Sequence, residues 1–115
     1  MFTIIFYETL ANKCPIAEFI AGLPKNLQAK AIRDIDILAE RGYHLREPYS
    51  KHLRDGLFEL RIQVSGDAAR IFYFFFIDEM IVLVDGFIKK TQKTPSGELE
   101  NALRYKTDYE RRASK

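Results

Sequence analysis

The sequence predicts an α+β domain in which an N-terminal strand and two helices precede an antiparallel β-meander and a C-terminal helix. Apolar residues recur at helical spacing before residue 42 and again after residue 95. Three strand-like segments follow one another between residues 56 and 88, and no helical pattern separates them. This order lacks βαβ alternation, so it favours α+β over α/β. A length of 115 residues fits one domain over 1–115.

The first half of the chain predicts one strand and two helices. "FTIIFYET", residues 2–9, is rich in β-branched and aromatic residues and predicts the strand. Helical spacing follows Pro15 until Gly22 interrupts it. Pro24 suits the first turn of a second helix, which Gly42 ends. The expected buried stripe of this helix is Leu27, Ala31, Ile35, Leu38 and Ala39, and Lys30, Arg33, Asp34 and Glu40 are expected away from it.

The second half predicts three strands and a helix. A polar passage over 44–55 leads into "GLFELRIQV", whose alternation predicts a strand with one face in water. "RIFYFFFI" and "MIVLVDGFI" are apolar throughout and predict strands at the centre of the sheet. Thr94 and Pro95 predict an N-cap and the first position of an amphipathic helix through Leu99, Leu103 and Tyr109.

Bulk properties favour a protein of the cytoplasm. The single cysteine, Cys14, cannot form an internal bridge, and we expect it to be an inert thiol. The longest apolar stretches are too short to span a bilayer as helices, so no membrane partner is expected. The net charge is only +2, but the residues from 87 onward hold eight cations against four acids. The C-terminal quarter is therefore basic.

Counting outward from the predicted turns indicates which side chains share a face. A two-residue loop at 66–67 would pair residue 63 with Arg70 and Arg61 with residue 72, so Arg61 and Arg70 would lie on one face. The same count around a loop at 78–79 pairs Ile77 with Met80, Arg70 with Phe87, and residue 72 with residue 85. A three-residue loop in either hairpin would turn the later side chains to the opposite face.

If this register holds, one face of the sheet is a cationic concavity with an aromatic floor, suited to a phosphate and a stacked base. Its members are Glu59, Arg61, Arg70, Asp85, Phe87 and Lys89, with Lys90 and Lys93 following the strand end. A simpler interpretation stays open. The two arginines could merely pair with Glu59 and Asp85 across strands, and Phe87 could be a core residue.

Other chemistry finds less support in the sequence. His44, His52 and Cys14 do not form a metal-spaced set, and no HExxH, CxxC or phosphate-binding glycine loop occurs. We therefore expect neither a metal nor a cofactor. His52 lies between the basic residues Lys51 and Arg54. These three residues are candidate RNA contacts, although a surface histidine with no such role is the simpler interpretation of His52.

Four segments in order carry a family resemblance: "KHLRDGLFELR", "ARIFYFF", "GFIKKTQKTP" and "NALRYKTDY". Together they resemble the HigB-like, phage-related branch of the RelE/ParE toxin superfamily of type II toxin–antitoxin systems. The resemblance implies a toxin that cuts messenger RNA, usually on the ribosome, and that is silenced by a partner antitoxin, here expected to be a HigA-like helix-turn-helix protein. It also implies metal-independent chemistry, in which the ribose 2′-hydroxyl attacks the adjacent phosphate and leaves a cyclic phosphate.

The resemblance places the family's functional cations at Arg61, Arg70, Lys89 and Lys90. We expect the two guanidinium groups to hold the scissile phosphate, because each donates two parallel hydrogen bonds and keeps its charge. Lys90 or Lys93 is the candidate for protonating the leaving oxygen. Glu59 could accept a proton if no arginine holds it, although some relatives carry a lysine there.

Two other functions stay open. ParE-like toxins share the fold and inhibit DNA gyrase without chemistry of their own, so the fold does not separate them from nucleases. The chain could also be an inactive domain that binds only an antitoxin or a nucleic acid. A gyrase supercoiling assay beside a translation assay would separate the first of these from an RNA-cleaving toxin.

Overall fold

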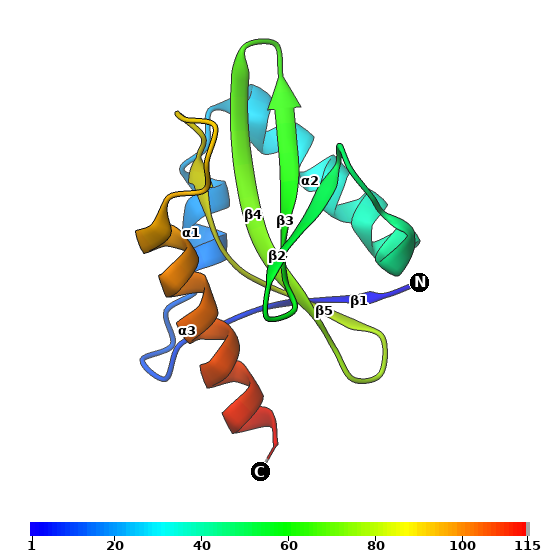
Figure 1. The fold of residues 1–115 in the computed structure, drawn as a ribbon, viewed down its shortest axis with the longest axis vertical. Coiled ribbons are helices and arrows are strands. Elements are labelled where there is room, and N and C mark those ends of the chain that lie inside the picture. The colour runs from blue at the N-terminus through cyan, green and yellow to red at the C-terminus, as the bar shows by residue number, and fades with distance from the viewer. Residues whose placement is uncertain (115) are drawn as a thin grey trace.

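The computed structural model describes residues 1–114, which form a five-stranded sheet and three α-helices (Figure 1). The elements are β1 (Thr3–Phe6), α1 (Pro15–Ala21), α2 (Lys25–Arg41), a 3₁₀ turn (Gly42–His44), β2 (Ser50–Arg54), β3 (Leu57–Val64), β4 (Asp67–Phe76), β5 (Met80–Ile88) and α3 (Ser96–Ala113). The strand order is β1-β5-β4-β3-β2; β1 runs parallel to β5, and the other neighbours are antiparallel. The predicted α+β class is confirmed, with one additional strand.

The sheet separates two apolar clusters, and helices cover both of its faces (Figure 1). On one face, Ile16 of α1 and the buried stripe of α2 pack against side chains such as Ile71. On the other face, Ala102 of α3 packs against side chains such as Phe74. Burying both faces removes far more apolar surface from water than a single layer could. No helix among the described residues combines the length and apolar character that crossing a membrane requires.

The sequence missed strand β2. The predicted loop over 44–55 contains it, because Ser50 pairs with Leu60 and Lys51 pairs with Glu59 of β3. A short polar strand at a sheet edge carries no apolar run or alternation that would reveal it. The prediction of one wet face on β3 is also wrong at its first residues: Leu57 and Glu59 are buried, since α3 and the segment before it cover that face.

Helix α2 has the predicted buried stripe, with one correction. All five predicted stripe residues are buried. Asp34 was expected on the exposed side but is buried too, because Lys30 Nζ neutralises it at 2.8 and 2.7 Å from its two carboxylate oxygens. The helix ends at Gly42, where φ is +50° and a Cβ would collide with the ring of Phe2.

The turn between β3 and β4 lies one residue earlier than predicted. Val64 pairs with Asp67, so the loop is Ser65-Gly66, with Ser65 in the left-handed region at φ 53°. The predicted partners for Arg61 and for residue 63 are therefore wrong by two positions. A shift of two keeps every side chain on its face. Arg61 and Arg70 share a face as predicted, and they are direct cross-strand partners.

The turn between β4 and β5 has three residues, not two, because Phe76 pairs with Met80 and leaves 77–79 in the loop. The predicted Ile77–Met80 pair is wrong, and the odd loop alone would turn the later side chains to the opposite face. A bulge reverses this change. The register shifts between Tyr73–Leu83 and Phe72–Asp85, where β5 inserts one extra residue. Arg70 consequently pairs with Phe87, as predicted.

Candidate functional site

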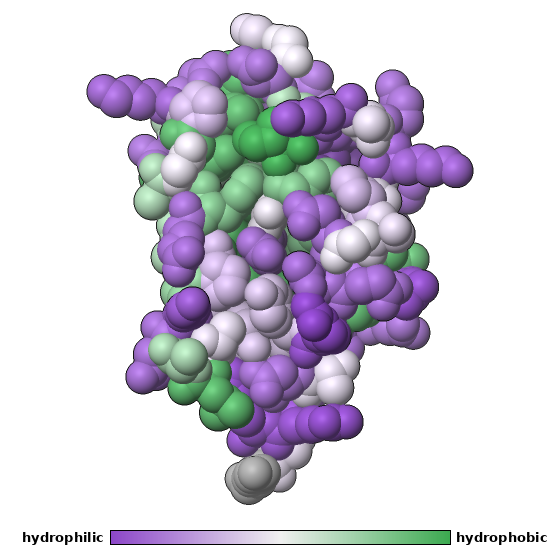
Figure 2. Space-filling view, turned by 90° about the vertical axis from the view of Figure 1, so that its left-hand side faces the viewer, coloured by the Kyte–Doolittle hydropathy of each residue, from purple (hydrophilic) through white to green (hydrophobic). Residues whose placement is uncertain are grey.

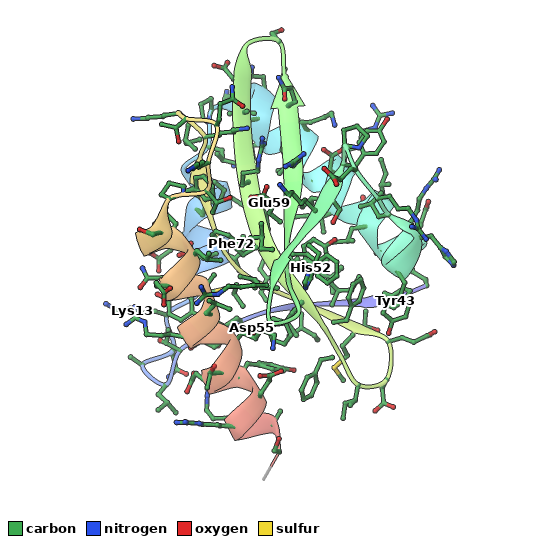
Figure 3. All side chains as sticks on the ribbon, viewed as in Figure 1. Lys13, Tyr43, His52, Asp55, Glu59 and Phe72 are labelled. Atoms are coloured by element: carbon green, nitrogen blue, oxygen red, sulfur yellow. The ribbon has the colours of Figure 1, made fainter. Side chains whose placement is uncertain are left out.

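The candidate site is a cross-strand row on the sheet face that also carries α3. Arg61 of β3 lies opposite Arg70 of β4, which in turn lies opposite Phe87 of β5. Two like charges side by side would repel each other, so the row requires a counter-charge. Glu59, the preceding inward-facing residue of β3, provides it. Figure 3 shows Glu59 over the middle of β3 and β4, above Phe72.

Glu59 is 3% exposed and is held from three directions. Its Oε2 lies 3.3 Å from Nε of Arg61 and 3.8 Å from Nε of Arg70, and its Oε1 accepts a hydrogen bond of 2.9 Å from the Thr94 hydroxyl. Both carboxylate oxygens are therefore engaged. The sequence predicts that Glu59 can accept a proton only if no arginine holds it. In the structure two arginines hold it, so Glu59 is not free for this role.

The two arginines differ in access. Arg70 is 5% exposed, and its Nη1 donates to the carbonyl of Ala69 at 3.1 Å. Burial lowers the pKa of Arg70; the Arg61 charge adds to this, and the Glu59 charge opposes it. The Arg61 side chain is 25% exposed, and its Nη1 lies 3.6 Å from Oε1 of the exposed Glu47. Arg61 is thus the guanidinium that a ligand can reach, while Arg70 contributes charge from beneath.

Lys89 extends the cationic row beyond the end of β5. Its backbone N–H donates to the carbonyl of Ala68 at 2.9 Å, so its half-buried side chain faces the same way as Phe87. Burial is the main cause that lowers the pKa of Lys89. The charges of Arg70, Arg61 and Lys51 lower this pKa further, and the charge of Glu59 raises it. A lysine in these surroundings gives up its proton more readily than a free one.

The lysines that follow are more exposed. Lys90 and Lys93 lie in the exposed segment between β5 and α3. This segment lies on the left in Figure 1, and Figure 2 shows that side of the molecule, where long hydrophilic side chains project around hydrophobic ones in the upper half. Thr94 anchors the segment to the site through Glu59. Thr94 is therefore not the predicted N-cap: Pro95 occupies that position, and no side chain among residues 1–114 caps α3.

The other predicted RNA contacts lie in different places. Lys51 is exposed on the site's face, opposite Glu59. His52, labelled in Figure 3, points to the other face. Its ring meets Phe58 edge-on with centroids 5.0 Å apart. Arg54 lies by α3, with Nη2 3.2 Å from Oε1 of Glu100. Phe87 is 7% exposed and packs against Phe72 in the core beneath α3. Only Lys51 joins the site.

Four cations, Arg61, Arg70, Lys89 and Lys51, thus surround one carboxylate, an excess of positive charge suited to a phosphate. Sequence reasoning missed two members of this arrangement, Thr94 and Glu47. Their contacts link segments far apart in the chain, so no local pattern signals them. Within residues 1–114, no three His, Cys, Asp or Glu side chains gather as a metal site.

Comparison with known proteins gives one family match. The family model described as phage derived protein Gp49-like (DUF891) matches residues 18–107. The matched stretch begins inside α1, ends inside α3 and includes every strand except β1. It therefore contains all of the site residues described above. A search of curated proteins finds no match.

Proposed function

We propose, since the chain belongs to the Gp49-like family of RelE/ParE-like toxins, that it is the toxin of a toxin–antitoxin pair and that it cuts messenger RNA. Membership of this family implies a cognate antitoxin. Gp49-like toxins are generally endoribonucleases. We further propose that the chain has the RelE-like fold, that it belongs to the HigB-like branch, and that its antitoxin is a HigA-like helix-turn-helix protein.

The observation that supports RNA cleavage best is the open guanidinium of Arg61 beside the buried guanidinium of Arg70 and the half-buried ammonium of Lys89. Arg61 binds a non-bridging oxygen of the scissile phosphate, and Arg70 stabilises the charge that develops there. Neither role requires a metal ion. Lys90 and Lys93 attract the RNA backbone from the exposed segment, and Lys51 does so from β2.

The proposed reaction is transesterification within the RNA. The 2′-hydroxyl oxygen forms a bond to phosphorus and loses its proton to water, while the bond from phosphorus to the 5′ oxygen breaks. Lys89 gives a proton to the departing 5′ oxygen, in place of Lys90 or Lys93, because Lys89 faces the arginines and its pKa is lowered. The products are a 2′,3′-cyclic phosphate and a 5′-hydroxyl.

The ribosome supplies orientation in this proposal. The central carboxylate of the site, Glu59, is engaged by Thr94, Arg61 and Arg70, so the chemical apparatus of the site itself is small. Holding the messenger in line for attack can contribute several orders of magnitude. Cleavage of naked RNA by the purified protein should consequently be far slower than cleavage of a translated message. Equal rates on both would contradict ribosome dependence.

One experiment tests the chemistry and the substrate together. A brief pulse of expression, followed by sequencing of RNA ends, should show new 5′-hydroxyl ends inside messages and arrested growth. Arg61→Gln should reduce these ends about 100-fold, the usual effect of removing one charge-stabilising donor. Arg104→Gln removes an exposed arginine of α3 and should leave them unchanged. Intact messages after wild-type expression would refute the proposal.

The closed state of the site favours a second candidate, a ParE-like gyrase inhibitor. Arg70 is buried and Glu59 is fully engaged, as expected for a structural ion-pair cluster with no chemistry. This candidate predicts loss of DNA supercoiling by purified gyrase when the chain is added, with messages left intact. The nuclease predicts the reverse pattern in the same two assays.

A further inference from the structure

A basic hollow lies on the face of the sheet opposite the candidate site, between α2 and the segment that leads into β2. Its volume is about 450 Å³. We call it the α2 hollow. Its lining residues are Lys30, Arg33, Asp34, Ile37, Arg41, Leu45, Tyr49 and Leu60. Figure 1 shows the segment from the end of α2 rising beside that helix to the start of β2. None of these residues takes part in the proposed cleavage.

One wall of the α2 hollow is basic. Lys30 is held by Asp34, whose two carboxylate oxygens lie 2.8 and 2.7 Å from Nζ. Arg33 and Arg41 are exposed, and neither makes an ion pair or a side-chain hydrogen bond with any residue from 1 to 114. The wall therefore carries two guanidinium groups free to bind an anion.

The other wall is apolar and ends in an aromatic ring. Leu60 is fully buried and forms the floor, and Ile37 and Leu45 are half-buried beside it. Tyr49 is 60% exposed and has no aromatic neighbour among those found in residues 1–114. An apolar floor with a tyrosine at its rim, next to guanidinium groups that have no partner within residues 1–114, suits a nucleobase and its phosphates.

The α2 hollow is joined to the candidate site around the edge of the sheet. Leu60 and Arg61 are neighbours in β3, and their side chains face opposite sides. The backbone N–H of Arg61 donates to the carbonyl of Tyr49 at 2.8 Å. Strand β2 begins at Ser50, opposite Leu60, so β3 itself is the edge of the sheet beyond this point. An RNA strand bound at Arg61 would therefore reach Tyr49 if it continued around this edge.

We propose that the α2 hollow is a second RNA subsite, which holds the nucleotides that flank the cleaved phosphate. One base stacks on Tyr49 over the apolar floor, and Arg33 and Arg41 bind the adjoining phosphates. This inference rests on the proposed function. The subsite fixes the position of the message, which gives cleavage its register, while Arg61, Arg70 and Lys89 act on the phosphate itself.

The test measures binding of uncleavable single-stranded RNA, with a 2′-O-methyl group on every ribose, by fluorescence anisotropy at low salt. With a nine-nucleotide RNA, Arg33→Gln/Arg41→Gln should weaken binding at least tenfold and reduce the slope of log K against log salt by about 1.4, since each single-strand phosphate contributes about 0.7. Tyr49→Ala should weaken it about tenfold, and Tyr49→Phe should restore it. With a trinucleotide, all of these variants should match wild type.

The matched control is Arg104→Gln/Arg111→Gln, which removes two charges from exposed residues of α3. If it weakens RNA binding as much as the Arg33/Arg41 variant, the effect is only net charge and the subsite is refuted. If the Arg33/Arg41 variant binds RNA normally but loses the antitoxin, the hollow is a protein interface and the subsite is again refuted. Failure of the proposed function gives a different result: cells that express Arg61→Gln and cells that express wild type would then show the same RNA ends in their messages.

Discussion

Replacing Glu59 by glutamine tests the ion-pair cluster on which the site is built. Glutamine keeps the shape and can still accept a hydrogen bond from Thr94, but it removes the charge that balances the buried Arg70. Breaking a buried pair from one side costs about 3–5 kcal/mol. Oε2 lies 3.3 and 3.8 Å from the two guanidinium nitrogens, longer than the roughly 2.7–2.9 Å of strong charge-assisted bonds. We therefore expect Glu59→Gln to lower the free energy of unfolding by about 3 kcal/mol, the lower end of this range.

Urea denaturation provides the assay. A loss of about 3 kcal/mol should lower the midpoint by at least 1 M urea with the slope unchanged, and the melting temperature should fall by roughly 12 °C. Glu47→Gln is the matched control, because Glu47 is exposed and lies 3.6 Å from the same arginine. Its cost should stay within about 0.5 kcal/mol. A midpoint for Glu59→Gln equal to that of Glu47→Gln would refute the reasoning.

A double substitution identifies the cause of the loss. If the uncompensated charge of Arg70 destabilises Glu59→Gln, then Glu59→Gln/Arg70→Met should recover most of the midpoint, since replacing a buried ion pair by apolar groups is often neutral. If the double variant stays as unstable as the single one, the cost arises from packing around residue 59 instead.

Three further substitutions test separate contacts. Burial, and then the neighbouring cations, lower the pKa of Lys89. The cleavage rate should therefore decline at a pH below the usual lysine value of about 10.4, and Lys89→Arg should move that decline to higher pH. Identical pH–rate profiles for the two proteins would exclude Lys89 as the acid. Thr94→Val should lower the free energy of unfolding by about 1 kcal/mol and speed hydrogen exchange of the amides in 89–95, whereas Thr94→Ser should change neither. Unchanged exchange in the valine variant would mean that the hydrogen bond to Glu59 does not order this segment. Burial, and then Asp108, which accepts the phenol's hydrogen bond at 2.6 Å, raise the pKa of Tyr7 to about 12. The stabilisation by the neutral phenol is then complete below about pH 10 and lost as pH rises through about 12, so the difference in unfolding free energy between wild type and Tyr7→Phe should shrink only over that interval. A difference that stays constant to pH 12 would contradict this assignment.

The parts of the fold that sequence could predict are those determined by local patterns. The stripe of α2 has helical period, and the apolar runs of β4 and β5 are too long and too rich in aromatic and β-branched residues to be loops. The shared face of Arg61 and Arg70 followed from the two-residue period of a strand, which tolerates an error of two in register.

The remaining features depend on contacts between distant segments. The second hairpin shows this most clearly. Its three-residue loop moves the register by one, and the bulge in β5 moves it back, so Arg70 still meets Phe87. Turn residues alone indicate neither change. Strand β2 forms only because β3 offers an edge, and the buried Arg70 faces Glu59, which Thr94 holds from 35 residues further along the chain.

The position of Glu59 separates the two candidate functions more sharply than the arginines do. A pure binder needs only the exposed Arg61 and the basic segment, and for it a locked Glu59 is a permanent structural brace. A nuclease also needs the charge of Arg70 to reach a phosphate, and the phosphate must then compete with Glu59 for the same two guanidinium groups. Glu59→Gln removes that competitor. For a nuclease, this substitution should therefore tighten binding of uncleavable RNA even as it destabilises the fold, whereas a gyrase binder should only lose stability. Measuring both quantities on the same protein preparation decides which description holds.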